Sequence, residues 1–197
     1  PWLSDLINDE YADARKKLKN EMENKTGNEL LKAKAWLAFI DFKEDEVSGL
    51  DKLLDLANDN SESQPITFLI SKMYSWENYY DQALDITNRG LERFVNDPDL
   101  LVLKSELLEG IGEKEEAINL LSDLKFSTIP DIAIALSKKY EEDDLDNAIN
   151  VIHTAYLKYP SNKKVVYKYA RLLQEANCDK EALFLLNYLC NSNPKEA

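Results

Sequence analysis

Apolar residues recur at steps of three and four along most of the chain, which is the spacing of one face of an α-helix. The first such segment, residues 3–23, predicts a single amphipathic helix, and the turn residues Thr26, Gly27 and Asn28 follow it. Later apolar segments come in pairs, separated by short polar turns. Five Gly and six Pro are few for 197 residues, as expected of helices joined by short connections. The pattern predicts an all-α protein of about eleven helices.

One alanine position repeats along the chain. It is occupied by Ala83, Ala117, Ala148 and Ala182, which follow one another at nearly equal intervals. The last two of these alanines are each followed twelve positions later by a proline, Pro160 or Pro194. A period in this range indicates stacked helical hairpins. The small side chain is explained if it lies where the two helices of a hairpin cross, because a larger one would push them apart.

The repeat predicts one solenoid domain over residues 1–197, since stacked repeats share a continuous core. Its predicted parts are a leading or capping helix, 1–27, and five repeats, 28–64, 65–97, 98–129, 130–161 and 162–197. The first residue is Pro1 and not Met, which favours a piece of a longer protein over loss of the initial Met.

The order of small, large and turn residues resembles the tetratricopeptide repeat (TPR). The matching residues are Gly112 with Ala117, then Ala148, Ala155 and Pro160, then Tyr169, Ala170, Ala182 and Pro194. The resemblance covers residues 30–196 and implies a right-handed α-α superhelix whose first helices line a concave groove. It departs from the family where Leu101, Ile132 and Val166 replace an aromatic residue, and where Gly49 and Gly90 replace Ala.

The resemblance also implies that the groove holds a segment of a partner protein. Projection of the family pattern onto the first helices gives the groove candidates Lys34, Phe68, Lys72, Glu106, Tyr140, Tyr167 and Arg171. Family members that grip a C-terminal carboxylate carry paired Lys and Asn in one register, which here reads Ala38, Lys72, Glu106, Ser137 and Arg171. That clamp is therefore not expected. We predict a protein-interaction scaffold; the alternative is a regulatory, sensor or oligomerisation region that controls an attached effector domain.

The charge narrows the choice of partner. The chain has 24 Lys and Arg against 37 Asp and Glu, a formal net charge of −13. Such a surface repels phosphate backbones, so nucleic-acid binding is disfavoured and basic peptides or proteins are favoured. No apolar run is long enough for a membrane span, and no signal peptide opens the chain. Two cysteines cannot form a disulfide framework, so the prediction is a cytoplasmic protein with reduced thiols.

No set of residues predicts catalysis, a cofactor or a metal site. His153 is the only histidine, and no nucleophile, base and acid can be assembled around it, so a surface or packing role is expected. The acidic runs 43–46 and 141–144 lack the alternating oxygen ligands and central Gly of a calcium loop, and are expected to be solvated turns.

The last helix is apolar almost all round, and such a helix is expected to be covered. Its apolar residues are Leu183, Phe184, Leu185, Leu186, Tyr188, Leu189 and Cys190. The first choice of cover is a further helix that this chain lacks, the second is a second copy of the chain, and the third is a partner protein. For a homodimer, the predicted association surface is Phe184, Leu185 and Tyr188.

Overall fold

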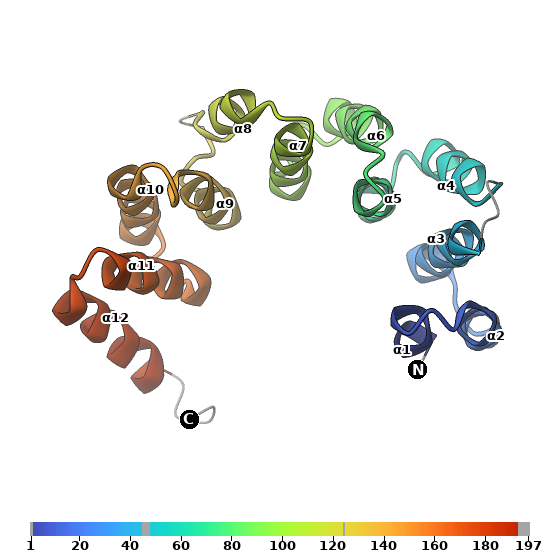
Figure 1. Ribbon diagram of the computed structural model, residues 1–197, viewed down its shortest axis with the longest axis horizontal. Coiled ribbons are helices and arrows are strands. Elements are labelled where there is room, and N and C mark those ends of the chain that lie inside the picture. The colour runs from blue at the N-terminus through green and yellow to red at the C-terminus, as the bar shows by residue number, and fades with distance from the viewer. Residues whose placement is uncertain (1, 45–47, 124, 193–197) are drawn as a thin grey trace. The chain divides into compact units, whose positions relative to one another are not determined.

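A computed structural model describes residues 2–44, 48–123 and 125–192, with side chains up to residue 190. Over these residues the fold is all-α, with twelve helices that pair in consecutive hairpins and no strand, which confirms the predicted fold class (Figure 1). The chain divides into two compact units, Pro1–Val95 and Asn96–Ala197. The division lies close to the boundary between the second and third predicted repeats. The single domain over 1–197 remains a prediction.

Unit 1 contains three hairpins. Their helices are α1 (Trp2–Ile7) and α2 (Tyr11–Met22), α3 (Gly27–Lys43) and α4 (Ser48–Asp59), and α5 (Gln64–Trp76) and α6 (Tyr80–Arg93). Helix α2 packs on α3, and α3 and α4 both pack on α5. The first helices of the second and third hairpins therefore lie side by side.

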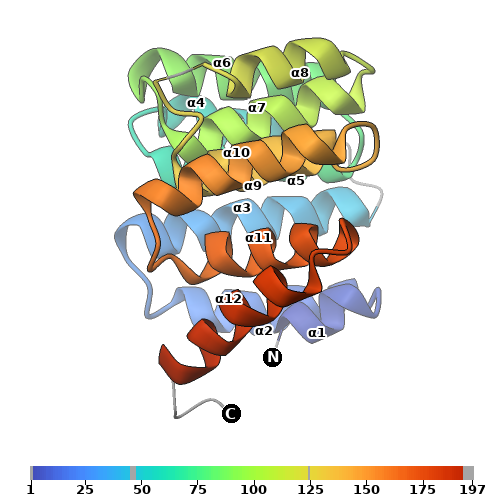
Figure 2. The ribbon, with the colours of Figure 1, turned by 90° about the vertical axis from the view of Figure 1, so that its left-hand side faces the viewer.

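Unit 2 repeats this arrangement with three further hairpins. Its helices are α7 (Pro98–Gly110) and α8 (Lys114–Leu121), α9 (Pro130–Tyr140) and α10 (Leu145–Lys158), and α11 (Lys163–Glu175) and α12 (Asp179–Ser192). Helix α9 packs on both α7 and α11, so the three first helices again form a row. Figure 2 shows α12 crossing obliquely below α11 at the C-terminal end.

The predicted single helix over residues 3–23 is wrong, because the chain reverses at Asn8 and Asp9 and forms a hairpin of α1 and α2. Asp9 has a left-handed backbone with φ of 61°, and the Glu10 N–H donates to the Asp5 carbonyl at 2.8 Å. This is a Schellman-type helix end, and Asp tolerates the left-handed conformation better than most residues. The step of four from Ile7 to Tyr11 continues the helical spacing across the turn, so periodicity alone cannot reveal it.

The same turn ends three other first helices. Asn78, Gly112 and Asn177 have φ of 62°, 90° and 59°. In each case the next N–H donates to a carbonyl five positions back, at 3.0 Å from Tyr79, 2.8 Å from Glu113 and 2.8 Å from Cys178. Asn and Gly are the residues that most readily take this conformation. One turn geometry therefore recurs in both units.

The repeated alanine position is buried in the second helix of four hairpins, as the predicted helix crossing requires. Ala83, Ala117 and Ala148 are 0% exposed and Ala182 is 3% exposed. The first full repeat has Gly49 there, and a Cβ atom on it would lie 2.5 Å from the Phe42 amide nitrogen and 2.6 Å from the Ala38 carbonyl oxygen. Helices α3 and α4 thus approach too closely even for alanine.

Candidate partner-binding surfaces

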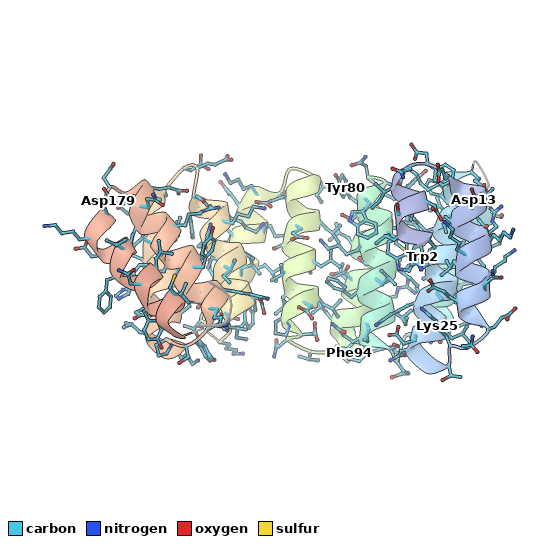
Figure 3. The ribbon with its side chains drawn as sticks, turned by 90° about the horizontal axis from the view of Figure 1, so that it is seen from below. Trp2, Asp13, Lys25, Tyr80, Phe94 and Asp179 are labelled. Carbon is cyan, nitrogen blue, oxygen red and sulfur yellow. The ribbon has the colours of Figure 1, made fainter. Side chains whose placement is uncertain are left out.

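In unit 1 the first helices are joined by aromatic rings. Trp2 of α1 lies 5.3 Å from Trp36 of α3, and Trp36 stacks on Trp76 of α5 with ring centroids 5.8 Å apart and an interplanar angle of 28°. We call the aromatic cluster the set Trp2, Trp36, Phe39, Phe42, Trp76 and Tyr79, which ring contacts of 5.3–6.3 Å connect. Each such pair contributes about 0.5–1.5 kcal/mol beyond burial of its area. Figure 3 labels Trp2 among the blue helices of unit 1.

The aromatic cluster is only partly buried. Phe39 is 6% exposed, whereas Trp76 is 51% and Tyr79 37% exposed. The Phe39 ring meets Trp76 edge-on at 6.0 Å, and the Tyr79 ring meets Phe42 edge-on at 6.1 Å. The packed side of the cluster therefore fixes the position of aromatic surface that remains accessible.

Ion pairs flank the aromatic cluster. Lys43 bonds to Glu77 at 3.1 Å, linking the end of α3 to the turn after α5. Asp41 accepts from Arg15 of α2 at 2.8 Å and from Lys52 of α4 at 2.8 Å. Burial favours a higher pKa for the Asp41 carboxyl, but the hydrogen bonds from Lys52 and Arg15 outweigh it and hold the pKa below its usual range. Asp41 thus stays ionised and ties three helices together.

Carboxylates dominate the electrostatics near Tyr11. Its hydroxyl donates to Asp9, and this hydrogen bond is the main reason that the pKa of Tyr11 rises to about 12. Partial burial and the negative charges of Asp9, Glu77 and Glu44 raise it further. Glu44 and Glu77 are thus close enough to act on one hydroxyl despite their pairing with Arg15 and Lys43.

The predicted groove residues of unit 1 differ in exposure. Lys34 is exposed and lines a shallow hollow with Asp41 and Lys52, while Phe68 and Lys72 on α5 are half-buried. Ala38, in the clamp register, is only 3% exposed and packs inside the hairpin. The projection therefore places Lys34 on the surface but fails for Ala38, whose backbone carbonyl lies at the close crossing with Gly49.

In unit 2 ion pairs join the first helices. The Lys139 side chain of α9 is 4% exposed, and its amine lies 2.6 Å from the Glu109 carboxylate and 3.4 Å from the Ser105 carbonyl, both on α7. Glu141, just after α9, accepts from both Lys168 and Arg171 of α11. We call Glu109, Lys139, Glu141, Lys168 and Arg171 the ionic ladder. Burial lowers the pKa of Lys168 below its usual range.

The predicted groove residues of unit 2 are Glu106, Tyr140, Tyr167 and Arg171, and Arg171 belongs to the ionic ladder. Glu106 is exposed and lines a hollow with Lys138 and Lys139. Tyr167 is 60% exposed on α11, one turn before Arg171. Tyr140 is half-buried against the core cluster around Ala133 and Ile152, so it serves packing at least in part.

Ser137 is a second failure of the projected register. It is 0% exposed, and its hydroxyl donates to the Ile134 carbonyl at 2.9 Å. The repeat spacing before Ser137 is three positions shorter than the others, but this does not explain its burial. Ser137 is buried for the same reason as Ala38. A small residue at this position is enclosed by the neighbouring helices and offers no surface.

The C-terminal helix is apolar on two sides, and only one of them is exposed. Leu185 is 5% exposed and belongs to the core cluster of Val166, Ala170 and Leu173, so its assignment to an association surface is wrong. On the opposite side, Phe184 is 71% and Tyr188 44% exposed. Residues 182, 185, 186 and 189 share the helix side that meets α11, which accounts for the burial of Leu185.

Sequence reasoning missed the aromatic cluster as a unit. Trp36 and Trp76 occupy different places in the repeat, so superposing one repeat on the next does not align them. It does superpose Phe42 and Trp76, so an aromatic residue at the same place in successive repeats was the available signal. Lys139 was also missed: its repeat position holds Ile40, Tyr74, Leu108 and Leu173 elsewhere, and a charge among apolar residues indicates a buried pair.

The described residues contain no group of three or more His, Cys, Asp or Glu side chains that could hold a metal ion. Within the same residues, no helix is both long and apolar enough to cross a membrane. His153 is exposed and stacks on Tyr169 with ring centroids 5.4 Å apart, which is the packing role expected for it.

No family model and no curated protein matches the sequence. Solved structures do resemble it. The thermophilic TPR protein TTC0263 of Thermus thermophilus superposes with a TM-score of 0.58 at 20% identity, over 88% of this chain and 95% of that one. MamA superposes with a TM-score of 0.53 at 12% identity, over 81% of this chain and 89% of MamA. The apo form of RapI superposes with a TM-score of 0.53 at 15% identity, over 94% of this chain and 60% of RapI.

These likenesses define a class of fold: the chain is an all-α, TPR-like protein built of consecutive helical hairpins. TPR folds typically mediate binding of proteins or peptides. With so few identical residues, the similarity extends to the fold and leaves the partner to be inferred from the chain's own surface.

Proposed function

We propose that this chain is a cytoplasmic protein-interaction scaffold that binds a partner segment on its row of first helices and performs no catalysis. The observation that carries the proposal is Tyr167, which is 60% exposed on a helix whose other side is packed into the core. Tyr and Arg are the residue types that most often anchor protein interfaces, and Arg171 lies one turn further along α11.

The net charge of −13 on the whole chain favours a partner with basic groups. In unit 2 the exposed residues Glu106 and Arg171 have opposite charges, and such charges set the register of a bound segment more than its affinity. Arg171 is held by Glu141 and lies 3.5 Å from Glu175, so it is pre-positioned on α11. Pre-positioned side chains reduce the entropy lost on binding.

Site-specific photo-crosslinking tests the proposal. A photoreactive phenylalanine analogue replaces Tyr167, and in a matched control it replaces Asn150, which is exposed on the second helix α10. Irradiation in cell extract should give one defined adduct at 167 and none at 150. Arg171→Glu should abolish that adduct while helicity by circular dichroism is unchanged. Equal labelling at both positions, or none at 167, contradicts the proposal.

The alternative is an oligomerisation or regulatory region, and the exposed side of α12 favours it. Leu183 is 60% exposed beside Phe184 and Tyr188, which leaves apolar surface uncovered on the last helix. Light scattering over a concentration series should then show a dimer that Phe184→Glu disperses and Asn187→Glu, on the same exposed side, leaves intact. A wild-type chain that stays monomeric throughout excludes this homodimer.

A further inference from the structure

Trp76 presents aromatic surface that the fold holds in place but does not cover. One face of its indole stacks on Trp36, and Phe39 meets it edge-on. Half of the side chain, 51%, is nevertheless exposed, so the accessible part lies away from Trp36. Because both neighbouring rings belong to α3, the position of this surface does not depend on a mobile loop. It is a preformed platform for a flat or cationic group.

The charges around this platform are predominantly negative. Residues 1–95 hold 12 Lys and Arg against 19 Asp and Glu, a formal charge of −7. Glu77 directly follows Trp76 in the chain, and its carboxylate is 20% exposed beside Lys43. The hydrogen bond to Asp9 is the main cause of the raised pKa of Tyr11, and the negative charges of Glu77 and Glu44 add to it, so both carboxylates act in this region.

We infer that Trp76 and Glu77 form a subsite for an arginine side chain of a basic partner segment. A guanidinium stacks on the open face of an indole more favourably than on any other side chain, and it can reach a carboxylate at the same time. This inference rests on the proposed scaffold function and names the chemistry of its ligand. The partner segment crosses the row of first helices in unit 1 and places an arginine on the ring.

Other occupants fit this surface less well. The phosphates of a nucleic acid or of an anionic membrane would meet Glu44 and Glu77 with the same sign of charge. A second copy of this chain would bring another strongly acidic surface against an acidic one, since the whole chain has a net charge of −13. A basic protein segment is the occupant that matches both the ring and the charge.

A peptide titration of the full chain tests the subsite. The probe is a capped heptapeptide in which glycine and arginine alternate, and the matched control has glutamine in place of each arginine. The chain is labelled with ¹⁵N, and the indole N–H signals of its three tryptophans are followed. The arginine peptide should shift the Trp76 signal saturably, and the glutamine peptide should bind about tenfold more weakly or worse.

Two variants separate binding from folding. Trp76→Leu should abolish saturable binding of the arginine peptide, measured by calorimetry. Trp76→Phe retains a ring to pack on Trp36 and should bind several-fold more weakly with the helix content of wild type. Glu77→Gln should weaken binding of the arginine peptide and leave binding of the glutamine peptide unchanged.

The outcomes distinguish this subsite from the scaffold function. Equal binding of both peptides overturns the arginine assignment and makes the platform a neutral aromatic site. No shift of the Trp76 signal overturns the subsite altogether. In either case a specific adduct at position 167 would still support the scaffold, because that crosslink is made in unit 2 and does not involve Trp76.

Discussion

The two units of this protein join their first helices in opposite ways. In unit 1 the contact across α1, α3 and α5 is made by stacked and edge-on rings, with Trp36 at its centre. In unit 2 charges add to the apolar packing of α9 on α11 and extend across to α7, with Lys139 bonded to α7 and Glu141 to α11. A single repeat position shows the contrast, because it reads Phe42, Trp76, Gly110, Glu141 and Glu175 along the chain.

The difference shows which part of the repeat is free to change. The buried alanines and the left-handed turns recur in both units, because helix crossing and chain reversal depend on them. The position just before each turn varies more freely. It carries rings in unit 1 and Glu141 in unit 2 without loss of the fold, and Trp76 of the proposed arginine subsite lies there.

One property of the sequence makes the two units separately observable. All three tryptophans, Trp2, Trp36 and Trp76, belong to unit 1. Tryptophan fluorescence therefore reports unfolding of unit 1, while helical circular dichroism reports both units.

The largest effect is expected for Trp36→Ala, which removes the ring at the centre of the aromatic cluster. Loss of its contacts with Trp2, Phe39 and Trp76 should lower the free energy of unfolding of unit 1 by about 3 kcal/mol, the lower end of the range for Trp→Ala. Urea titration followed by the fluorescence of the two remaining tryptophans measures it. The control Tyr167→Ala removes an exposed ring of unit 2 and, measured by circular dichroism, should cost less than about 0.5 kcal/mol. Equal effects would show that the rings do not join the helices.

Gly49→Ala should destabilise unit 1 by about 2 kcal/mol, because the added carbon overpacks the crossing of α3 and α4. Helix propensity alone predicts the opposite sign, a gain of about 1 kcal/mol for Ala over Gly inside a helix. The sign of the change in urea midpoint therefore decides between the two. The control Ala117→Gly changes the same repeat position in unit 2. Both packing and helix propensity predict that it lowers the stability of that unit.

Glu141→Gln should lower the stability of unit 2 by about 1.5 kcal/mol, since it leaves Lys168, with a side chain only 11% exposed, without its carboxylate. Circular dichroism should register the loss while the fluorescence transition of unit 1 is unchanged. Glu142→Gln alters the exposed neighbouring carboxylate and should cost less than about 0.5 kcal/mol. A shift of the fluorescence transition by Glu141→Gln would contradict an effect confined to unit 2.

The sequence predicts the parts of this fold that depend on period and residue size. The helix crossings and the order of the hairpins follow from the regular spacing of Ala83, Ala117, Ala148 and Ala182 alone. The reversal at Asp9 could not be predicted from apolar spacing, because the spacing continues through it. Leu185 and Phe184 are adjacent apolar residues, and only the direction of α12 relative to α11 decides that one is buried and the other exposed.

The candidate site was predicted less completely for a similar reason. Projection of the repeat finds Tyr167 and Arg171, which extend from one helix, but it treats every repeat alike. The aromatic cluster arises between helices, from Trp36 and Trp76 at different repeat positions. Its detection requires the distance between α3 and α5, and that distance depends on side-chain packing which the sequence pattern does not specify.

The smallest effect is expected for Tyr74→Phe, and it tests the pH response of unit 1. The Tyr74 hydroxyl is buried and donates to the Leu50 carbonyl at 2.7 Å, so its loss should cost about 1 kcal/mol at pH 7. Burial, with smaller contributions from Asp51 and Asp55, raises the pKa of Tyr74 from 10.0 to about 12. Between these values the unfolded chain releases the proton first, so the contribution of Tyr74 is complete below pH 10 and is lost as the pH rises through 12. The stability difference between wild type and Tyr74→Phe, measured by tryptophan fluorescence in urea, should therefore shrink from pH 9 to pH 11.5. A difference that stays constant over this range would show that the hydroxyl ionises no later in the folded chain than in the unfolded one.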